Sequence, residues 1–438
     1  MGQAERSPGS SAVEIESLAH DGRGVARIAG KAAFVEGALP GERVLFKRQR
    51  TRRGFDEGVA TDILETSPRR VEPRCPHFGV CGGCALQHMD AEAQIDAKQA
   101  VLLDNLDRIG RLTPKEVLPP LQGPAWGYRR RARLGAKYLP AKRRLLLGFR
   151  QRRSARLTDM RTCEVLDPRI GRRIEALADL LGGLSIARHL PQIEVAVADN
   201  AVVLVLRVMR EPSPEDRDRL RAFAASHGVE FHLQPGGEDS IAPLDPPAVE
   251  LSFEPEAGGP QLFFRPGDFI QVNDAVNQAM VARALELVAP SPGERVLDLF
   301  CGLGNFSLPL AARGARVTGI EGDPGLVARA RDNARRNGLS GAEFSVANLF
   351  NPDFRAQPWW RDGCDQLLLD PPRSGADAVA RHIAEVSPRR IVYVSCHPAS
   401  LARDAATLCV EGGYRLVAAG VLDMFPQTAH VESMAVFE

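Results

Sequence analysis

The segment from about Gly293 to the C-terminus alternates short apolar runs with stretches of helical spacing. The apolar runs are RVLDLF, RVTGIE, AEFSVAN, QLLLD and RRIVYVSC, and helical patterns such as LVARARDNARRNG lie between them. Strands separated by helices are expected to pair in parallel, because a parallel pair needs a long crossover connection. We therefore predict a doubly wound, mainly parallel α/β sheet in this part of the chain.

The first predicted strand runs into a glycine turn, in the sequence VLDLFCGLGNF. Gly302 and Gly304 carry no Cβ, so the backbone can pass close to a ligand. The next predicted strand ends at Glu321, where a carboxylate can bind both hydroxyls of a ribose. NAD and S-adenosylmethionine both carry an adenosine, but Ser307 replaces the third glycine of the dinucleotide pattern. The D-x-F-x-G-x-G sequence favours S-adenosylmethionine, and a tight structural turn without a ligand is the alternative.

Two later predicted strands end in reactive side chains, Asp370 in QLLLDPPR and Cys396 in IVYVSCHP. Ligands of open α/β sheets bind beyond the carboxyl ends of the strands, so we expect both residues near the glycine turn. A thiolate beside a methyl donor suits methylation of uracil, because its addition to carbon 6 makes carbon 5 nucleophilic. A base must then remove the carbon 5 proton, and Glu432 in FPQTAHVE is our candidate. Taken alone, each residue is also compatible with a structural cysteine or a surface acid.

The N-terminal region has a different pattern. Residues 1 to about 12 are predicted to be disordered, and short alternating stretches with glycine turns follow from Ala12 to about Glu65. Five short strands at this spacing predict a small β-barrel. Basic side chains are concentrated at Lys47 to Arg53 and in residues 128–158, which hold twelve Arg or Lys residues and no acid. Such clusters suit a polyanion, although a basic face paired with acids elsewhere explains them equally well.

Between these regions we predict a helix at Ala91 to Ile109, a basic β-rich section from Tyr128 to about Met160, a hairpin at Ile193 to Met209 that turns at Asp199-Asn200, and a helix at Pro212 to His227. A chain of 438 residues is too long for one ordinary core, so two or three domains are expected. Neither a secretory signal nor a long apolar run is present, so we expect a cytoplasmic protein without a membrane span.

Three cysteines, Cys75, Cys81 and Cys84, lie within one Gly-rich stretch of ten residues. A fourth, Cys163, follows far along the chain. In a cytosolic protein, clustered cysteines indicate metal binding or catalysis more often than disulfides. Four thiolates can hold either Zn²⁺ or an iron–sulfur cluster, and the spacing alone does not choose between them.

The motifs DLFCGLGNFSLPLA, DPPRSG, YVSCHPASLARD and DMFPQTAHVE resemble, in this order, those of the RNA uracil-5-methyltransferases. The segment FRPGDFIQVN resembles the one that precedes the catalytic core of that family, and the N-terminal barrel resembles an RNA-binding TRAM domain. The cysteine cluster is similar to the iron–sulfur site of the ribosomal RNA members. The resemblance covers essentially the whole chain and implies a bacterial enzyme that acts on 23S rRNA, in a single-stranded or loop region.

The resemblance also implies roles for individual residues. Cys396 is the implied nucleophile and Glu432 the proton acceptor. The implied S-adenosylmethionine site consists of Gln271, Phe300, Asn305, Glu321, Asn348 and Asp370. The implied ligands of a [4Fe–4S] cluster are Cys75, Cys81, Cys84 and Cys163. One departure is His397, because the family usually has Asn after the nucleophile; a protonated histidine there would favour the thiolate.

The resulting expectation is an α/β protein with three domains: a TRAM-like barrel at 1–66, a β-rich cluster-bearing domain at 67–260 and a Rossmann-like class I methyltransferase domain at 261–438. Helices near 91–120 are expected to pack on the catalytic domain. We expect a monomer with no protein partner. The alternatives are the same chemistry on another uridine or on tRNA, and a non-catalytic RNA-binding assembly factor. An iron–sulfur NAD oxidoreductase is disfavoured, because DPPR and Cys396 supply no hydride acceptor site.

Overall fold

The computed structural model describes residues 10–438, and these residues pack as two compact units. The first unit comprises the described residues up to Lys98, together with Arg150–Ala155 and Phe425–His430. The second comprises Gln99–Phe149, Arg156–Met424 and Val431–Glu438. The three-part division expected from the sequence stays a prediction. No helix of the described chain is long and apolar enough to cross a membrane.

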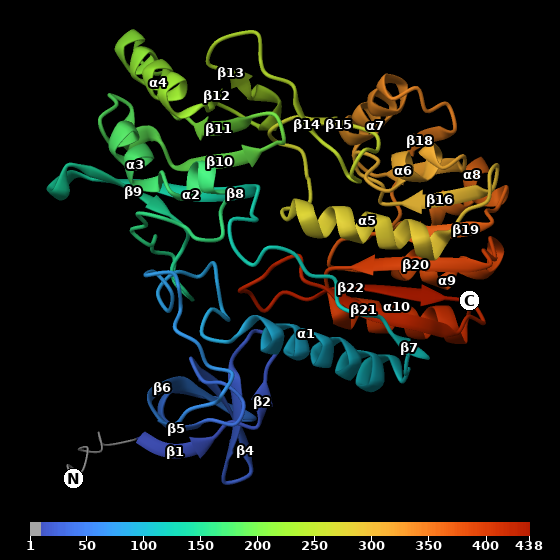
Figure 1. The fold of residues 1–438 in the computed structure, drawn as a ribbon, viewed down its shortest axis with the longest axis horizontal. Coiled ribbons are helices and arrows are strands. Elements are labelled where there is room, and N and C mark those ends of the chain that lie inside the picture. The colour runs from blue at the N-terminus through green and yellow to red at the C-terminus, as the bar shows by residue number, and fades with distance from the viewer. Residues whose placement is uncertain (1–9) are drawn as a thin grey trace. The chain divides into compact units, whose positions relative to one another are not determined.

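The first unit contains a six-stranded sheet in the order β1-β5-β6-β4-β3-β2 (Figure 1). Its strands are β1 (Ser10–Glu14), β2 (Ser17–Leu18), β3 (Gly24–Ile28), β4 (Lys31–Glu36), β5 (Arg43–Thr51) and β6 (Phe55–Glu65). Alternating side chains such as Val44 and Phe46 form its buried core. Because β1 begins at Ser10, the expected disorder is wrong for residues 10–12, and its remainder lies outside the described residues.

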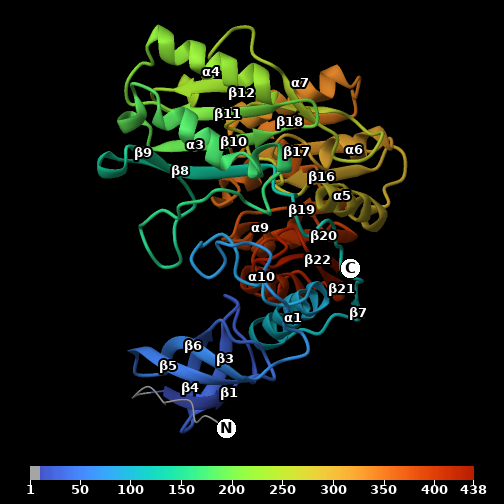
Figure 2. The same ribbon diagram turned by 60° about the vertical axis from the view of Figure 1, so that its left-hand side comes forward.

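The second unit contains a six-stranded sheet in the order β13-β12-β11-β10-β8-β9. Its strands are β8 (Arg131–Leu139), β9 (Arg144–Gly148), β10 (Gln192–Val197), β11 (Val202–Arg207), β12 (Glu230–Gln234) and β13 (Ala242–Pro243). Helices α3 (Ile174–Gly182) and α4 (Pro214–His227) pack against β9 and β12 (Figure 2). The predicted hairpin and the helix after it are confirmed as β10–β11 and α4.

The larger sheet of the second unit has eight strands in the order β18-β17-β16-β19-β20-β22-β21-β7 (Figure 1). Its strands are β7 (Glu116–Val117), β16 (Arg295–Leu299), β17 (Arg316–Glu321), β18 (Ala342–Val346), β19 (Gln366–Leu369), β20 (Arg390–Ser395), β21 (Leu416–Leu422) and β22 (Glu432–Phe437). The strands from β18 to β20 are parallel to one another, and β22 runs antiparallel to both β20 and β21. The predicted parallel sheet is confirmed.

Helices cover this sheet, which explains why β16, β19 and β20 read as continuous apolar runs. They are α5 (Asp274–Val288), α6 (Ser307–Ala312), α7 (Pro324–Arg336), α8 (Pro358–Arg361), α9 (Asp377–Arg381) and α10 (Pro398–Val410). Helix α7 begins where Asp323 caps it, its side chain accepting a hydrogen bond from the Leu326 N–H at 2.9 Å.

The remaining elements are short or connect the larger ones. They are α1 (Ala91–Asn105), the π-helical turn η1 (Leu106–Gly110), α2 (Pro168–Gly171), β14 (Leu251–Phe253), β15 (Leu262–Phe264) and the 3₁₀ turns η2 (Pro140–Lys142), η3 (Ala187–His189), η4 (Glu238–Ser240), η5 (Pro352–Ala356) and η6 (Ile383–Glu385). The predicted helix at Ala91 to Ile109 is thus α1 with its π-helical last turn. The predicted β-rich section is shorter than expected, because no named strand lies between Gly148 and Met160.

Candidate active site

The carboxyl ends of β19 and β20 and the start of β22 bring three reactive side chains to one edge of the sheet. Ser395 of β20 is paired with Ser433 of β22 in an antiparallel ladder. The same register sets Cys396, one residue further along, opposite Glu432. On the other side of β20, Leu369 is paired with Tyr393 in parallel, so Asp370 follows at the same edge. The predicted convergence of thiol and carboxylates therefore has a simple cause in strand register.

The charges around Cys396 follow from this placement. Burial, together with the negative charges of Glu432 and Asp370, raises the pKa of the half-buried Cys396 thiol to about 12, although the Arg373 guanidinium lowers it. Glu432 is itself only 8% exposed. At neutral pH the thiol of the free protein is therefore protonated. Activation of the sulfur requires positive charge or removal of its proton when the substrates bind.

A second carboxyl, that of Asp298, lies close enough to Asp370 to affect its pKa. Burial and the nearby negative charge of Asp298 together raise the pKa of Asp370 to about 7. Asp298, in the middle of β16, is wholly buried, and burial raises its pKa to about 7 as well. The Ser307 hydroxyl donates to one of its carboxyl oxygens, and the other has no hydrogen-bond partner among the described residues. Sequence reasoning gave Asp298 no role, although it is the acid of the D-x-F-x-G-x-G pattern.

The glycine turn has a left-handed backbone at three positions. Gly302 and Gly304 have φ angles of +54° and +91°, and Phe300 has an unusual +65° for a residue with a side chain. A Cβ on Gly304 would approach Leu308 to 3.1 Å, whereas one on Gly302 would meet nothing within 4 Å. Gly304 is therefore needed for packing, and open space lies over Gly302 where a ligand can approach the backbone.

Glu321 is held against this turn by backbone hydrogen bonds. Its carboxylate accepts hydrogen bonds from the N–H groups of Gly302 at 3.2 Å, Gly322 at 2.6 Å and Asp323 at 3.1 Å. These contacts fix the carboxylate at the carboxyl end of β17, and a carboxylate has acceptor sites left for ribose hydroxyls. The open space over Gly302 and this fixed carboxylate fit the adenosine of S-adenosylmethionine.

The other residues expected at the cofactor site differ in their exposure and in the contacts that their side chains make. Asn305 exchanges two hydrogen bonds with Asn277 of α5, at 2.9 and 3.1 Å. Asn348 is exposed and its side-chain oxygen accepts from the Phe350 N–H at 3.0 Å. The rings of Phe300 and the 54% exposed Phe350 lie 5.7 Å apart between centroids. An exposed aromatic beside the turn suits adenine, and Phe350 was missed because nothing in the sequence distinguishes it from a core residue.

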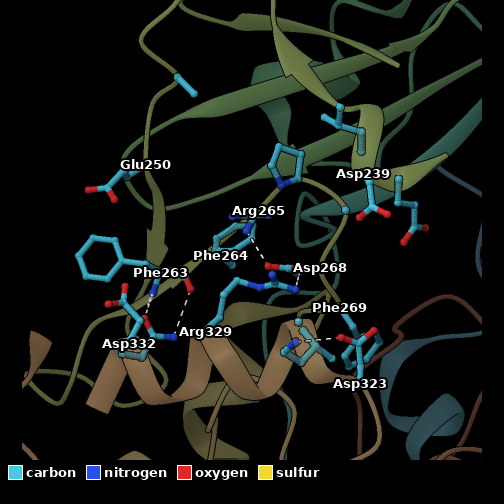
Figure 3. Close-up of a pocket in the computed structure, with 18 of the residues that line it drawn as sticks. Asp239, Glu250, Phe263, Phe264, Arg265, Asp268, Phe269, Asp323, Arg329 and Asp332 are labelled. Carbon is cyan, nitrogen blue, oxygen red and sulfur yellow. Dashed lines mark hydrogen bonds and ion pairs between the residues drawn. The ribbon is translucent and has the colours of Figure 1, made fainter. Parts of the chain in front are cut away.

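The segment that leads to Gln271 is fixed to α7 beside a separate cavity of about 870 Å³ (Figure 3). Figure 3 shows Arg329 of α7 reaching Asp268, with which it forms an ion pair. Asn333 of α7 accepts a hydrogen bond from the Phe263 N–H at 2.9 Å and donates one to its carbonyl at 3.2 Å. None of the residues expected to bind S-adenosylmethionine lines this cavity. The half-buried Gln271 thus follows a segment whose backbone is anchored.

His397, the departure from the family pattern, caps α10. Its Nδ1 accepts from the Ser400 N–H at 3.3 Å and lies 2.9 Å from the Ser400 hydroxyl. Asn is also a good capping residue, so the histidine keeps the local role of the residue that it replaces. This capping bond requires an unprotonated Nδ1.

The cysteines expected to bind a cluster lie in different parts of the chain. Cys75, Cys81 and Cys84 belong to the first unit and Cys163 to the second, and none forms a disulfide. Within the first unit, the Gly83 N–H donates to the Cys81 sulfur at 3.4 Å. Among residues 10–438, no group of three or more His, Cys, Asp or Glu side chains is placed to hold a metal ion. The cluster therefore stays a prediction.

The basic clusters contain both paired and unpaired cations among the described residues. Arg48 of β5 pairs with Asp56 at 3.0 Å, and in the second unit Arg131 and Arg133 pair with the buried Glu194. Other cations are exposed and have no ion pair among the described residues: Arg52 and Arg53 after β5, and Lys142 and Arg143 before β9. The tips of two hairpins, one in each unit, thus carry uncompensated positive charge.

Comparison with known proteins adds independent information. The tRNA (uracil-5-)-methyltransferase family matches residues 259–438, and the TRAM domain family matches residues 12–58. The chain is 52% identical over 428 residues to the 23S rRNA (uracil(1939)-C(5))-methyltransferase RlmD of Stenotrophomonas maltophilia (strain K279a), with 97% of this chain and 96% of the relative covered. It is equally 52% identical to the enzyme of the same name from Xanthomonas axonopodis pv. citri (strain 306), over 99% of this chain and 98% of that one.

Among solved structures, the fold resembles that of the tRNA (uracil-54, C5)-methyltransferase of Pyrococcus abyssi, crystallised with S-adenosyl-L-homocysteine. The TM-score is 0.75 at 24% identity, and the match covers 98% of this chain and 99% of the other. At this identity the likeness shows the fold alone. It extends over both units of the chain.

Proposed function

The chain belongs to the family of the 23S rRNA (uracil-C5)-methyltransferases and is an S-adenosylmethionine-dependent RNA uracil-5-methyltransferase, and on that premise we propose its substrate and mechanism. The substrate is 23S ribosomal RNA, at the uridine equivalent to the position 1939 that names its relatives. The observation that carries the mechanism is the pairing of β20 with β22, which sets Cys396 opposite Glu432.

We propose that Cys396 is the nucleophile. The thiol gives its proton to water, and the thiolate adds to carbon 6 of a uracil that has left the RNA stack. The carbon 5–carbon 6 double bond opens, and a carbon–sulfur bond and an enolate form. Arg373 favours the thiolate electrostatically, whereas Glu432 and Asp370 oppose it. Bound S-adenosylmethionine supplies an electrophilic methyl group and one positive charge. A thiol that stays mostly protonated until this charge arrives reacts only slowly in the free enzyme.

Glu432 is the proposed proton acceptor. Carbon 5 of the enolate takes the methyl group, and S-adenosylhomocysteine leaves. The carboxylate then removes the carbon 5 proton, the carbon–sulfur bond breaks, and the electron pair returns to the sulfur of Cys396. The buried setting of Glu432 at the start of β22 supports this role, because a base screened from water keeps its orientation toward the ring. Gln271, Phe300, Asn305, Glu321, Asn348 and Asp370 are the proposed S-adenosylmethionine residues.

The iron–sulfur cluster is a separate proposal, with Cys75, Cys81, Cys84 and Cys163 as ligands. The support is the set of four cysteines without disulfides and the N–H that donates to the Cys81 sulfur, a contact that also stabilises thiolates bound to iron. Methyl transfer needs no redox step, so the cluster is proposed to be structural. Iron and sulfide analysis of anaerobically purified protein, with zinc measured in parallel, distinguishes the two metals.

The functional proposal is tested in cells that lack this protein. Mass spectrometry of their 23S rRNA is expected to show an unmethylated uridine at one position, and methylation returns with the wild-type chain but not with Cys396→Ala. Equal restoration by both proteins would exclude covalent catalysis. Rescue of ribosome assembly by Cys396→Ala, without methylation, would favour the non-catalytic assembly factor.

A further inference from the structure

The loop 370–376 follows β19 and carries both Asp370 and Arg373. Its backbone is held by side chains from the first two turns of α10. The contacts are Ser400 Oγ donating to the Arg373 carbonyl at 2.6 Å, the Arg403 guanidinium donating to the Ser374 carbonyl at 2.8 Å, and the Ala376 N–H donating to Asp404 Oδ2 at 2.6 Å. A loop of this length at a sheet edge would otherwise present these groups to water.

Asp404 lies at the centre of these contacts and is wholly buried. Besides the Ala376 N–H, it accepts a hydrogen bond from the Tyr393 hydroxyl at 2.7 Å and from the Arg403 Nε at 2.8 Å. Tyr393 is on β20, three residues before Cys396. We call Tyr393, Ser400, Arg403 and Asp404 the loop clamp. It joins the loop 370–376 to the strand that carries the thiol.

Gly375 shows how closely the loop packs against the clamp. Its φ angle is +79°, and a Cβ at this position would lie 2.4 Å from Asp404 Oδ2 and 3.1 Å from the Ser400 Cβ. Any larger residue would meet both a strained backbone and a fixed carboxylate. The loop clamp therefore fixes the position of the loop 370–376.

Arg373 depends on that loop for its position. Its side chain is exposed and makes no hydrogen bond or ion pair with any other residue in the described range. Its charge nevertheless acts on the Cys396 thiol. Because no contact of its own holds the guanidinium, its position depends on the backbone of the loop.

We infer that Asp404 is a positioning residue, which holds the loop 370–376 against β20 so that Arg373 stays at the edge of the sheet that carries Cys396. Its consequence for catalysis rests on the proposed function. The positioning of the loop by Asp404 does not rest on the proposed function, because the reactivity of the thiol can be measured without RNA. The direct field of Asp404 works in the opposite sense: removal of a negative charge would by itself make the thiol more acidic and more reactive.

The test is a double-mutant cycle between Asp404→Asn and Arg373→Gln. Each full-length protein is treated with iodoacetamide at pH 8, and alkylation of the Cys396 peptide is followed by mass spectrometry. A thiolate is the reactive form, so the rate reports the ionised fraction of this one sulfur. Thermal unfolding and S-adenosylmethionine affinity are measured on the same samples. Tyr393→Phe removes one hydroxyl only and serves if Asp404→Asn fails to fold.

The matched control is Asp216→Asn in α4. Asp216 is likewise buried and accepts from the Ser185 N–H at 2.8 Å, but it holds a loop of the smaller sheet of the same unit. We expect Asp404→Asn and Arg373→Gln each to slow alkylation about tenfold, the effect of a change of one pKa unit. In the Arg373→Gln background Asp404→Asn should add nothing, and Asp216→Asn should change nothing.

Three results would overturn the inference: an equal slowing by Asp404→Asn in both backgrounds, a faster reaction, or no effect of Arg373→Gln. Failure of the proposed function looks different. It appears as a wild-type protein that forms no covalent adduct with RNA although the cycle shows the expected coupling.

Discussion

We call the part of the large sheet around β16 and β17 the cofactor half and the part around β20 and β22 the pyrimidine half. The two halves differ in how far their side chains are already arranged for their proposed roles. In the cofactor half, Glu321 of β17 accepts three backbone hydrogen bonds, one of them from the glycine turn after β16, before any ligand binds. In the pyrimidine half, the thiol of Cys396 and the carboxyl of Asp370 have raised pKa values, and Arg373 lacks partners among the described residues. One half is ready to bind, whereas the other must change its protonation to react.

Loss of the nucleophile gives the largest expected effect. Cys396→Ser should lower methyl transfer by about 10⁴-fold or more, as removal of a covalent nucleophile does in other enzymes. Binding of S-adenosylmethionine, measured by calorimetry, should remain, since the cofactor half is untouched. Cys409→Ser, at a half-buried thiol in α10, is the control and should retain full activity. A parallel loss of cofactor affinity in Cys396→Ser would show that the two halves are not separable.

Removal of the base comes second. Glu432→Gln should lower turnover by about 10²- to 10⁴-fold, the usual contribution of a positioned proton acceptor. Because adduct formation precedes this step, protein linked to ordinary uridine RNA should accumulate on denaturing gels. Glu438→Gln, just beyond the opposite end of β22, is the matched control. Absence of accumulated adduct in Glu432→Gln would assign proton removal to another group.

The cofactor half is expected to respond through binding. Glu321→Gln should raise the KM for S-adenosylmethionine about 10- to 100-fold, since a hydrogen bond to a charged group contributes about 1.5–3 kcal/mol. The kcat should change little, because the lost contacts do not involve the reacting atoms. Glu343→Gln on β18, an exposed acid of the neighbouring strand, should leave both constants unchanged. A fall in kcat with constant KM would place Glu321 in the pyrimidine half.

The smallest effect is the dependence on pH. In the free protein the pKa of Cys396 lies at about 12, so the thiolate fraction should rise up to tenfold for each pH unit between 7 and 9. Ionisation of Asp370, whose pKa is about 7, adds negative charge beside the thiol and should make the rise somewhat less steep. Iodoacetamide alkylation of Cys396 at several pH values measures this slope. A rate independent of pH would mean that the thiol is already ionised.

The cofactor half could be predicted in more detail than the pyrimidine half. The glycine turn and Glu321 lie within about twenty residues of each other, and their pattern directly encodes a strand, a turn and a carboxylate. Asp370, Cys396 and Glu432 were each identified from strand-end positions or from the family resemblance. The placement of Glu432 opposite Cys396 depends on the antiparallel insertion of β22 beside β20, which no local pattern specifies.

Other features could not be predicted from the sequence, because they too depend on contacts between residues that are distant in the chain. The protonated state of Cys396 depends on burial, and the loop clamp depends on contacts between β20, α10 and the loop 370–376. The basic region of residues 128–158 gave no sign that Glu194 neutralises part of it from β10. Pairing across a sheet joins residues that are distant in sequence, and a single chain without its structure does not reveal such partners.

The most direct test of the central claim uses 23S rRNA fragments that contain 5-fluorouridine, with S-adenosylmethionine present. Fluorine at carbon 5 leaves no proton for Glu432 to remove, so the methylated ring should stay attached to the protein. Mass spectrometry of the digested complex should find this nucleotide on the peptide that contains Cys396, in wild-type protein and not in Cys396→Ala. An adduct on any other residue, or efficient methyl transfer without an adduct, would contradict the account.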